Sequence, residues 1–317
     1  MKRVLVTGAT GFIGRHTLAP LVAKGFEVHA LAGPGEAPVF DKALWHEADL
    51  LNAGQTQALV QKVSPSHLLH LAWHTDPADY RASTKNRFWM DAGLELARAF
   101  VGAGGRRAVF AGSCFEYGPV DGPCHEIKTP CQPDTLYGQA KHELFCRLAA
   151  DLKPKDMALA WARLFFVYGP GESPEKLIPT VINNLMQGRP APLTGGGELA
   201  DYLFVEDAAL ALIEILDGKV TGPINVASGK PLTIRQIAEE INRQTGAAGC
   251  LKFGEYPLPP AQKILADTTR LSKEVGWKPA TGLGEGIAKA IRFWRKGLPL
   301  ARDLTSPFSD SRPAQRL

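Results

Sequence analysis

The sequence has no long hydrophobic run and no large excess of charge of either sign. It contains no stretch of about 18 apolar residues, which argues against a membrane-spanning helix. The 36 Lys and Arg residues nearly balance the 32 Asp and Glu residues, giving a formal net charge of +4, and the basic residues form no cluster or tail. These absences argue against a membrane partner and against a nucleic-acid partner.

Cysteines with metal-binding or redox spacing are absent as well. The five cysteines form no C-x-x-C pair and no Cys/His metal spacing, and no acid or cysteine completes a metal set with the histidines between residues 67 and 74. The chain passes directly from MKR into VLVTG, without the apolar segment and cleavage site of a signal peptide. We therefore expect free thiols, no metal and a cytoplasmic location.

Strand and helix patterns alternate through the first half of the chain. Short apolar segments bounded by turn residues are typical of buried parallel strands; they are RVLVTG, EVHALA, HLLHLAW and RAVFAGS. Helical patterns separate or follow them, at Phe12–Lys24, Gln55–Val63, Arg81–Ala103 and Thr135–Asp151, and a further strand, ALAWARLFFVYG, comes next. This alternation predicts an α/β fold with a doubly wound parallel sheet of the Rossmann type.

After Gly169 the chain becomes rich in Gly and Pro, with short helices predicted at Leu177–Gln187, Val205–Leu216 and Ile234–Gly246. We expect residues 1–168 to form a dinucleotide-binding domain. Residues 169–300 would form a smaller C-terminal substrate-binding region over the carboxyl edge of the sheet, with residues 203–228 returning to the first domain. Residues 301–317 have little to bury, and we expect a mobile tail.

The segment VTGATGFIG carries three glycines between a strand and a helix. Gly8 permits a tight turn, Gly11 lets the backbone approach a pyrophosphate, and Gly14 allows close packing of the helix on the strand. The amino terminus of the helix then offers N–H groups to the anion. The residues expected to contact the dinucleotide here are Gly8, Thr10, Gly11, Phe12, Ile13 and Gly14.

The end of the second strand distinguishes NAD from NADP, because an acid there binds the adenosine ribose. This strand ends in Ala32 and Gly33, so the sequence shows no carboxylate to repel a 2′-phosphate and favours NADP(H) over NAD(H). Asp49 follows a third strand and is placed to meet the adenine amino group, with Leu50 beside it; a helix cap or turn is the alternative role for Asp49.

Tyr137 and Lys141 lie four residues apart in LYGQAKHE, on one face of a predicted helix. A tyrosine with a pKa of about 10 transfers protons poorly at neutral pH unless a cation favours its phenolate, and the lysine supplies that cation. Ser113 stands at the end of the fifth strand, where active sites of open α/β sheets collect. We expect these three residues to be catalytic.

With these residues in place, the chain resembles the extended short-chain dehydrogenases/reductases of the nucleotide-sugar epimerase/dehydratase family. The matching segments are TGATGFIG, HLAW, SCFEYG, YGQAK, ARLFFVYGPGE, DYLFVEDAA, INVASG and LADTTRLSKEVGWKP. The resemblance implies catalytic roles for Ser113, Tyr137 and Lys141. It also places a further set of residues around the cofactor, namely Asp49, Leu50, Leu71, Ala72, Trp73, Asn86, Tyr137 and Lys141.

Departures from the family pattern reduce the number of reactions that this chain is expected to catalyse. Dehydratases of this family carry an Asp-Glu pair after the catalytic hydroxyl residue, where this chain has Cys114 and Phe115. The family also has Asn at the position of Phe166 and Arg at the position of Ala200, and both grip the diphosphate of the nucleotide. Candidate substrate-binding residues are Trp73, Cys114, Phe115, Phe166, Lys176 and Arg189, the last two as replacement phosphate ligands. Glu116 and Tyr117 stand near Ser113 and are further candidates.

HLAW, GSCFEYG and WARLFFVYG resemble the branch of 4-ketoreductases of deoxysugar pathways that contains dTDP-6-deoxy-L-talose 4-dehydrogenase. We therefore expect an NAD(P)H-dependent oxidoreductase that reduces the 4-keto group of a nucleotide-activated deoxysugar. The alternatives are a nucleotide-sugar 4-epimerase and a reductase of small carbonyl compounds that carry no nucleotide. The resemblance also implies a homodimer that pairs the helices predicted at 81–103 and 135–151.

Overall fold

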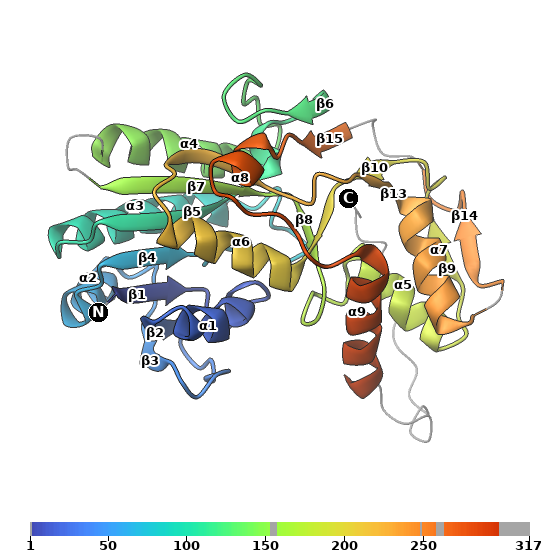
Figure 1. Cartoon of the computed structure of the whole chain (residues 1–317), viewed down its shortest axis with the longest axis horizontal. Helices are drawn as coiled ribbons and strands as arrows, with labels where there is room; N and C mark the ends of the chain where they lie inside the picture. Colours follow the sequence, from blue (N-terminus) through green and yellow to red (C-terminus); the bar gives the residue numbers. More distant parts are fainter. Residues whose placement is uncertain (1, 153–156, 248, 258–262, 298–317) are drawn as a thin grey trace.

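The computed structural model describes residues 2–152, 157–247, 249–257 and 263–297, and these residues form two regions (Figure 1). A parallel sheet covered by helices makes up the first region. A smaller region, built from short strands and helices, lies beyond the carboxyl ends of the strands of that sheet (Figure 1). The predicted tail at 301–317 lies outside the described residues.

The main sheet has seven strands, all parallel. Their spatial order is β12 (Gly222–Val226), β7 (Ala158–Leu164), β5 (Arg107–Ser113), β4 (His67–His70), β1 (Lys2–Thr7), β2 (Phe26–Ala32) and β3 (Leu44–Glu47). The chain proceeds from β1 toward β3 on one side and returns to β4 on the other. Ligands of open α/β sheets bind at such a point, outside the carboxyl ends of the strands. The predicted fold class is confirmed.

Helices cover both faces of this sheet because its strands are apolar on both sides. One face carries α1 (Gly14–Ala23) and α6 (Val205–Asp217), which pack on each other. The opposite face carries α2 (Ala53–Val63), α3 (Lys85–Gly102) and α4 (Leu136–Leu152). Strand β1 serves both layers: Val4 and Val6 belong to the core under α1 and α6, and Leu5 belongs to the core under the other three helices.

The single strand predicted for ALAWARLFFVYG is wrong, because the structure divides it. β7 ends at Leu164, and the next strand, β8 (Phe166–Tyr168), leaves the main sheet to pair with β11 (Tyr202–Phe204). Between them, the N–H of Phe165 donates to the carbonyl of Val226, at the end of β12. The main sheet offers the chain no neighbour beyond that point, and a continuous apolar pattern does not show where a strand changes partner.

The smaller region is held together by α5 (Leu177–Met186), α7 (Ile234–Thr245) and α9 (Leu283–Gly297), which share an apolar core. Short elements complete the described residues: β6 (Asp121–Cys124) with β15 (Lys263–Ala266), β9 (Ala191–Leu193) with β14 (Leu251–Phe253), β10 (Leu199–Ala200) with β13 (Leu232–Thr233), the 3₁₀ helix η1 (Cys114–Glu116) and α8 (Thr269–Lys273).

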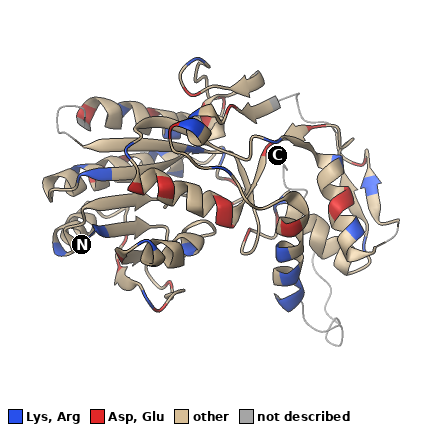
Figure 2. Ribbon diagram, in the orientation of Figure 1, with Lys and Arg blue, Asp and Glu red and all other residues tan. Residues whose placement is uncertain are grey.

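Basic and acidic residues are interspersed over both regions, with a basic stretch along α9 (Figure 2). None of the helices in the described ranges has the length and apolar character needed to cross a membrane.

Candidate active site

The turn between β1 and α1 fits a dinucleotide phosphate. Gly8 has φ +67°, and a Cβ atom built there would lie 2.7 Å from the backbone N of Ala72. A Cβ atom on Gly14 would lie 2.0 Å from the carbonyl oxygen of Gly8. Glycine is therefore required at both positions. Among the described residues, no side chain caps the start of α1 at Ile13, and the amino terminus of a helix favours an anion.

Neighbouring residues hold this turn in shape. The N–H of Leu71 donates to the carbonyl of Thr7 at 3.2 Å, which fixes the segment after β4 against the glycines. Arg15 binds the turn from the helix side, with its guanidinium donating to the carbonyls of Thr10 and Gly11 at 2.6 and 3.2 Å. The ring of Phe12 packs edge-on against His16.

The expectation that no carboxylate stands at the end of β2 is wrong. The chain turns back after Gly33, and the N–H of Glu36 donates to the Gly33 carbonyl at 3.0 Å. This turn brings the Glu36 carboxylate onto the strand end, where Oε2 accepts from the N–H of Gly33 at 2.8 Å and from the hydroxyl of Thr10 at 2.6 Å. The available signal was spacing, since Glu36 follows Gly14 by about 20 residues, as an acid that binds the ribose does.

Asp49 lies in the turn between β3 and α2. Its carboxylate accepts from the N–H of Leu51 at 2.9 Å, and its own N–H donates to the side chain of Gln55 at 2.8 Å. Leu50 beside it is buried. The carboxylate therefore has a structural partner, and the contact with adenine stays a prediction.

Ser113 is the last residue of β5, and its side chain is buried. Its hydroxyl oxygen accepts from the N–H of Phe115 at 3.2 Å, which starts η1. An N–H donor occupies one lone pair and leaves the hydroxyl proton free to be donated elsewhere. Ser113 can thus offer a hydrogen bond to an oxygen atom beyond the strand end.

Tyr137 and Lys141 stand one turn apart on α4, and the structure brings both to the end of β5. Burial raises the pKa of Tyr137, and a hydrogen bond with Ser113 acts in the opposite direction. Lys141 is only 2% exposed, and its ammonium donates to the carbonyl of Ala111 at 2.7 Å. Burial lowers the pKa of Lys141 to about 7, while the negative charge of Glu116 acts to raise it. Two hydroxyls and an ammonium therefore meet at one place.

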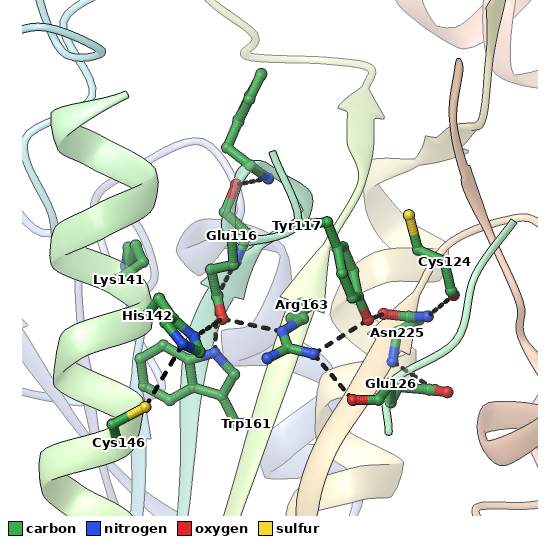
Figure 3. Close-up of polar contacts among 12 residues, drawn as sticks. Glu116, Tyr117, Cys124, Glu126, Lys141, His142, Cys146, Trp161, Arg163 and Asn225 are labelled. Atoms are coloured by element: carbon green, nitrogen blue, oxygen red, sulfur yellow. Dashed lines mark hydrogen bonds and ion pairs between the residues drawn. The ribbon is translucent and has the colours of Figure 1, made fainter. Parts of the chain in front are cut away.

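Glu116 and Tyr117, the further candidates for substrate contact, are both fully buried. The Glu116 carboxylate accepts from the backbone N–H of Ser113 at 2.8 Å, from the indole of Trp161 at 2.8 Å and from the guanidinium of Arg163 at 2.9 Å (Figure 3). Tyr117 donates to the side chain of Asn225 at 2.8 Å. Glu116 completes a capping box with Ser113, and the pattern S-x-x-E in SCFE was its sequence signal.

Aromatic side chains lie near the hydroxyls of Ser113 and Tyr137. The ring of Phe115 lies 6.2 Å from that of Tyr137 and 6.3 Å from that of Phe166, edge-on to both. Phe166 also packs on Tyr202, with 5.4 Å between ring centroids. Cys114 is buried, and burial raises the pKa of its thiol to about 12. The thiol of Cys114 is therefore protonated near neutral pH and Phe115 has no ionisable group, so neither residue supplies a base.

The two predicted phosphate ligands lie in different surroundings. The ammonium of Lys176 lies 4.7 Å from the ring centroid of Tyr80, and that ring is 5.1 Å from the ring of Tyr137. Arg189 is exposed beyond the end of α5, where its guanidinium donates to the side chain of Asn184 at 3.1 Å. Of the two, only Lys176 is thus connected to Tyr137 through contacts of the described residues.

Trp73 and Asn86, both expected near the cofactor, form a pair. The indole N–H of Trp73 donates to Oδ1 of Asn86 at 2.8 Å. The amide of Asn86 donates to the carbonyls of Tyr80 and Ser83 at 2.6 and 2.8 Å. The polar atoms of Asn86 therefore already have partners within the segment that follows β4.

Comparison with known proteins decides the family. A model of the NAD dependent epimerase/dehydratase family matches residues 4–227. The chain belongs to this family. It is therefore an enzyme of a class that includes NAD-dependent nucleotide-sugar epimerases, dehydratases and dehydrogenases, as the resemblance implied.

Three relatives show how far the likeness extends. The chain is 29% identical over 266 residues to dTDP-6-deoxy-L-talose 4-dehydrogenase (NAD(+)) of Aggregatibacter actinomycetemcomitans, over 80% of this chain and 94% of that protein. It is 30% identical over 319 residues to UDP-glucose 4-epimerase of Mycolicibacterium smegmatis, over 92% and 98% of the two chains. The crystal structure of the UDP-glucose 4-epimerase of Thermus thermophilus in complex with NAD matches with a TM-score of 0.81 at 25% identity, over 93% and 100% of the chains.

Proposed function

We propose that this protein reduces the 4-keto group of a nucleotide-activated deoxysugar with a nicotinamide cofactor. One observation carries the proposal: Ser113, Tyr137 and Lys141 meet at the end of β5, while Cys114 and Phe115 supply no carboxylate and no base beside them. A site with one proton-transferring hydroxyl suits reduction of a carbonyl and disfavours elimination of water. The likeness to the 4-dehydrogenase of Aggregatibacter actinomycetemcomitans points in the same direction.

The roles of the residues follow from their positions. The hydroxyls of Ser113 and Tyr137 bind the carbonyl oxygen, where negative charge develops during reduction. When bound, the nicotinamide ring supplies the hydride. Tyr137 gives its proton to the new alkoxide; burial, which raises its pKa, keeps that proton in place before the reaction. The ammonium of Lys141 then stabilises the phenolate that remains.

NAD(H) is the cofactor that we propose. The expectation of NADP(H) depended on the lack of a carboxylate after β2, and Glu36 removes that premise. A carboxylate accepts a hydrogen bond from a ribose 2′-hydroxyl and repels a 2′-phosphate. The Thermus thermophilus relative was solved with NAD, and the name of the 4-dehydrogenase relative specifies NAD(+).

A homodimer through α3 and α4 also stays part of the proposal. Phe88 on α3 is 63% exposed and Leu136 at the start of α4 is 43% exposed, so both helices present apolar side chains to the surface. Light scattering at micromolar concentration would give twice the monomer mass if these helices pair. A monomeric mass for the unmodified protein would reject the dimer.

The second candidate is a nucleotide-sugar 4-epimerase. It is favoured by the 30% identity to the Mycolicibacterium smegmatis epimerase over nearly the whole of both chains. An epimerase uses the same hydroxyls and returns the hydride to the other face of the sugar, so the side chains alone do not separate the two reactions.

Steady-state turnover of a substrate panel tests the proposal. The panel contains dTDP-4-keto-6-deoxyglucose and its L-rhamno epimer with NADH or NADPH, UDP-galactose, and free ketones without a nucleotide. We expect cofactor oxidation with a dTDP-4-keto sugar. Turnover of UDP-galactose alone would favour the epimerase, and turnover of free ketones alone would reject a nucleotide-linked substrate.

A further inference from the structure

Lys141 has an unusual environment for a charged side chain. Its ammonium lies 3.6 Å from the centre of the Trp73 ring system. The residue as a whole is 2% exposed. Within the described ranges, the carbonyl of Ala111 is the one hydrogen-bond acceptor of this ammonium, which has three donors. A buried ammonium without further acceptors loses much of its hydration, and an aromatic face is the other group here that attracts a cation.

The orientation of the indole is fixed by contacts that do not involve Lys141. The indole N–H donates to Asn86 at 2.8 Å, and Asn86 is anchored in turn by the carbonyls of Tyr80 and Ser83. The Trp73 ring also stands edge-on to the ring of Tyr137, with 6.3 Å between centroids. Since its edge is held by Asn86, the ring keeps its face toward the lysine.

We propose that Trp73 is a positioning residue for Lys141, which it holds beside Tyr137 and stabilises in the charged form through its indole face. The inference depends on the proposed function only in that Lys141 acts in catalysis. In this proposal Trp73 acts on Lys141 and not through contact with cofactor or substrate. Asn86 orients the indole of Trp73.

Other titratable groups face Lys141 and also influence its pKa. Tyr137 lies on the same helix, with its ring centre 5.9 Å from the ammonium. Glu116 acts from η1 to raise the pKa of the lysine. His70 acts from β4, and burial together with the charge of Lys141 lowers its pKa to about 3, so it is neutral near pH 7. None of these groups is altered when only Trp73 is replaced.

The test is a titration of Lys141 by NMR in the substrate-free protein, with lysine labelled with ¹³C at Cε and with K141M to assign the signal. Loss of the aromatic face disfavours the charged form, so W73L should lower the pKa of Lys141 by about one unit, and W73F by about half as much. The alkaline limb of kcat/KM should move to lower pH by the same amounts.

A near-isosteric probe separates the electrostatic role from packing. Fluorinated tryptophan weakens the attraction of the ring for a cation without changing its shape much, so the pKa of Lys141 should fall with each added fluorine in the unmodified chain and stay constant in W73F. W45F and W45L are matched controls, because Trp45 donates to the carbonyl of Phe40 at the edge strand β3; they should leave the titration unchanged.

An unchanged Lys141 titration in W73F and in the fluorinated protein would overturn the proposal, as would an equal shift in W45F. Because the titration needs no substrate, its result is separate from that of the proposed function. A shifted lysine with no turnover of any keto sugar would contradict the proposed function and support the role of Trp73.

Discussion

We propose that the cofactor binds on one side of this site and the substrate on the other, and the two sides are built differently. On the cofactor side the backbone makes the surface: Gly8 and Gly14 are glycines because any Cβ atom would collide with backbone atoms. On the substrate side the surface consists of side chains from separate segments, such as Phe115, Phe166 and Tyr202. A requirement of the backbone restricts one position to one residue type, so it can be recognised in a sequence. A surface made of side chains depends on which distant segments come together, and the sequence does not show this directly.

The largest expected effect on turnover comes from replacing Tyr137, which lies where the two sides of the site meet. Y137F removes the hydroxyl that transfers the proton, so kcat should fall by about 10²–10⁴-fold while the cofactor still binds. Y80F is the matched control, because Tyr80 packs 5.1 Å from Tyr137 and should leave kcat near that of the unmodified enzyme. Steady-state kinetics together with a cofactor titration would check both variants. Near-normal turnover in Y137F would reject the assigned role.

A substitution on the cofactor side should act through the backbone. G14A places a Cβ atom 2.0 Å from the carbonyl oxygen of Gly8, so the turn must shift. We expect the free energy of unfolding to fall by about 3 kcal/mol and cofactor affinity to fall with it. G102A is the control, since a Cβ atom there meets no atom of the described residues within 4 Å. Denaturation curves that coincide for G14A and G102A would contradict the close approach of residue 14 to the carbonyl oxygen of Gly8.

Glu36 tests a part of the proposed cofactor side that is made by a side chain. E36Q keeps a hydrogen-bond acceptor and removes the charge, so affinity for NADPH should rise about tenfold while affinity for NADH changes little. E239Q, an exposed acid on α7, is the control and should change neither affinity. Fluorescence titration of both cofactors measures the ratio. Unmodified protein that prefers NADPH would show that Glu36 does not select the cofactor.

The smallest expected effect concerns the substrate side. Lys176 lies over the ring of Tyr80, which packs near Tyr137, whereas Arg189 donates to the side chain of Asn184 at the surface. If Lys176 replaces the missing phosphate donors, K176M should raise KM for the nucleotide sugar about three- to tenfold with little change in kcat. R189M should leave KM unchanged. Equal effects of the two variants would mean that proximity to Tyr80 does not mark the phosphate site.

The sequence was sufficient for the architecture because strand and helix periods are local. The helices predicted at 177–187 and 205–216 differ by one residue at their ends from α5 and α6, and the strand RAVFAGS coincides with β5. The helix predicted at 81–103 begins only at Lys85, because side-chain contacts of Asn86 hold the preceding residues in a turn.

Features that depend on a change of direction were not predictable in the same way. The break between β7 and β8 follows from where neighbouring strands end, and the apolar pattern is continuous across it. Glu36 reaches the end of β2 only because the chain turns back at Gly33. Glu116 was one of two further candidates for substrate contact because it lies near Ser113 in the sequence, and its ion pair with Arg163 depends on a strand that is distant in the sequence.

The most direct test of the proposed reaction follows a deuterium label from the cofactor into the sugar product. The enzyme is given dTDP-4-keto-6-deoxyglucose, or its L-rhamno epimer, with NADH that carries two deuterium atoms at C4 of the nicotinamide. Mass spectrometry of the sugar product and absorbance of the cofactor are recorded together. Reduction predicts one deuterium in the product for each NADH oxidised. A 4-keto sugar that gains no deuterium and consumes no NADH would contradict reduction.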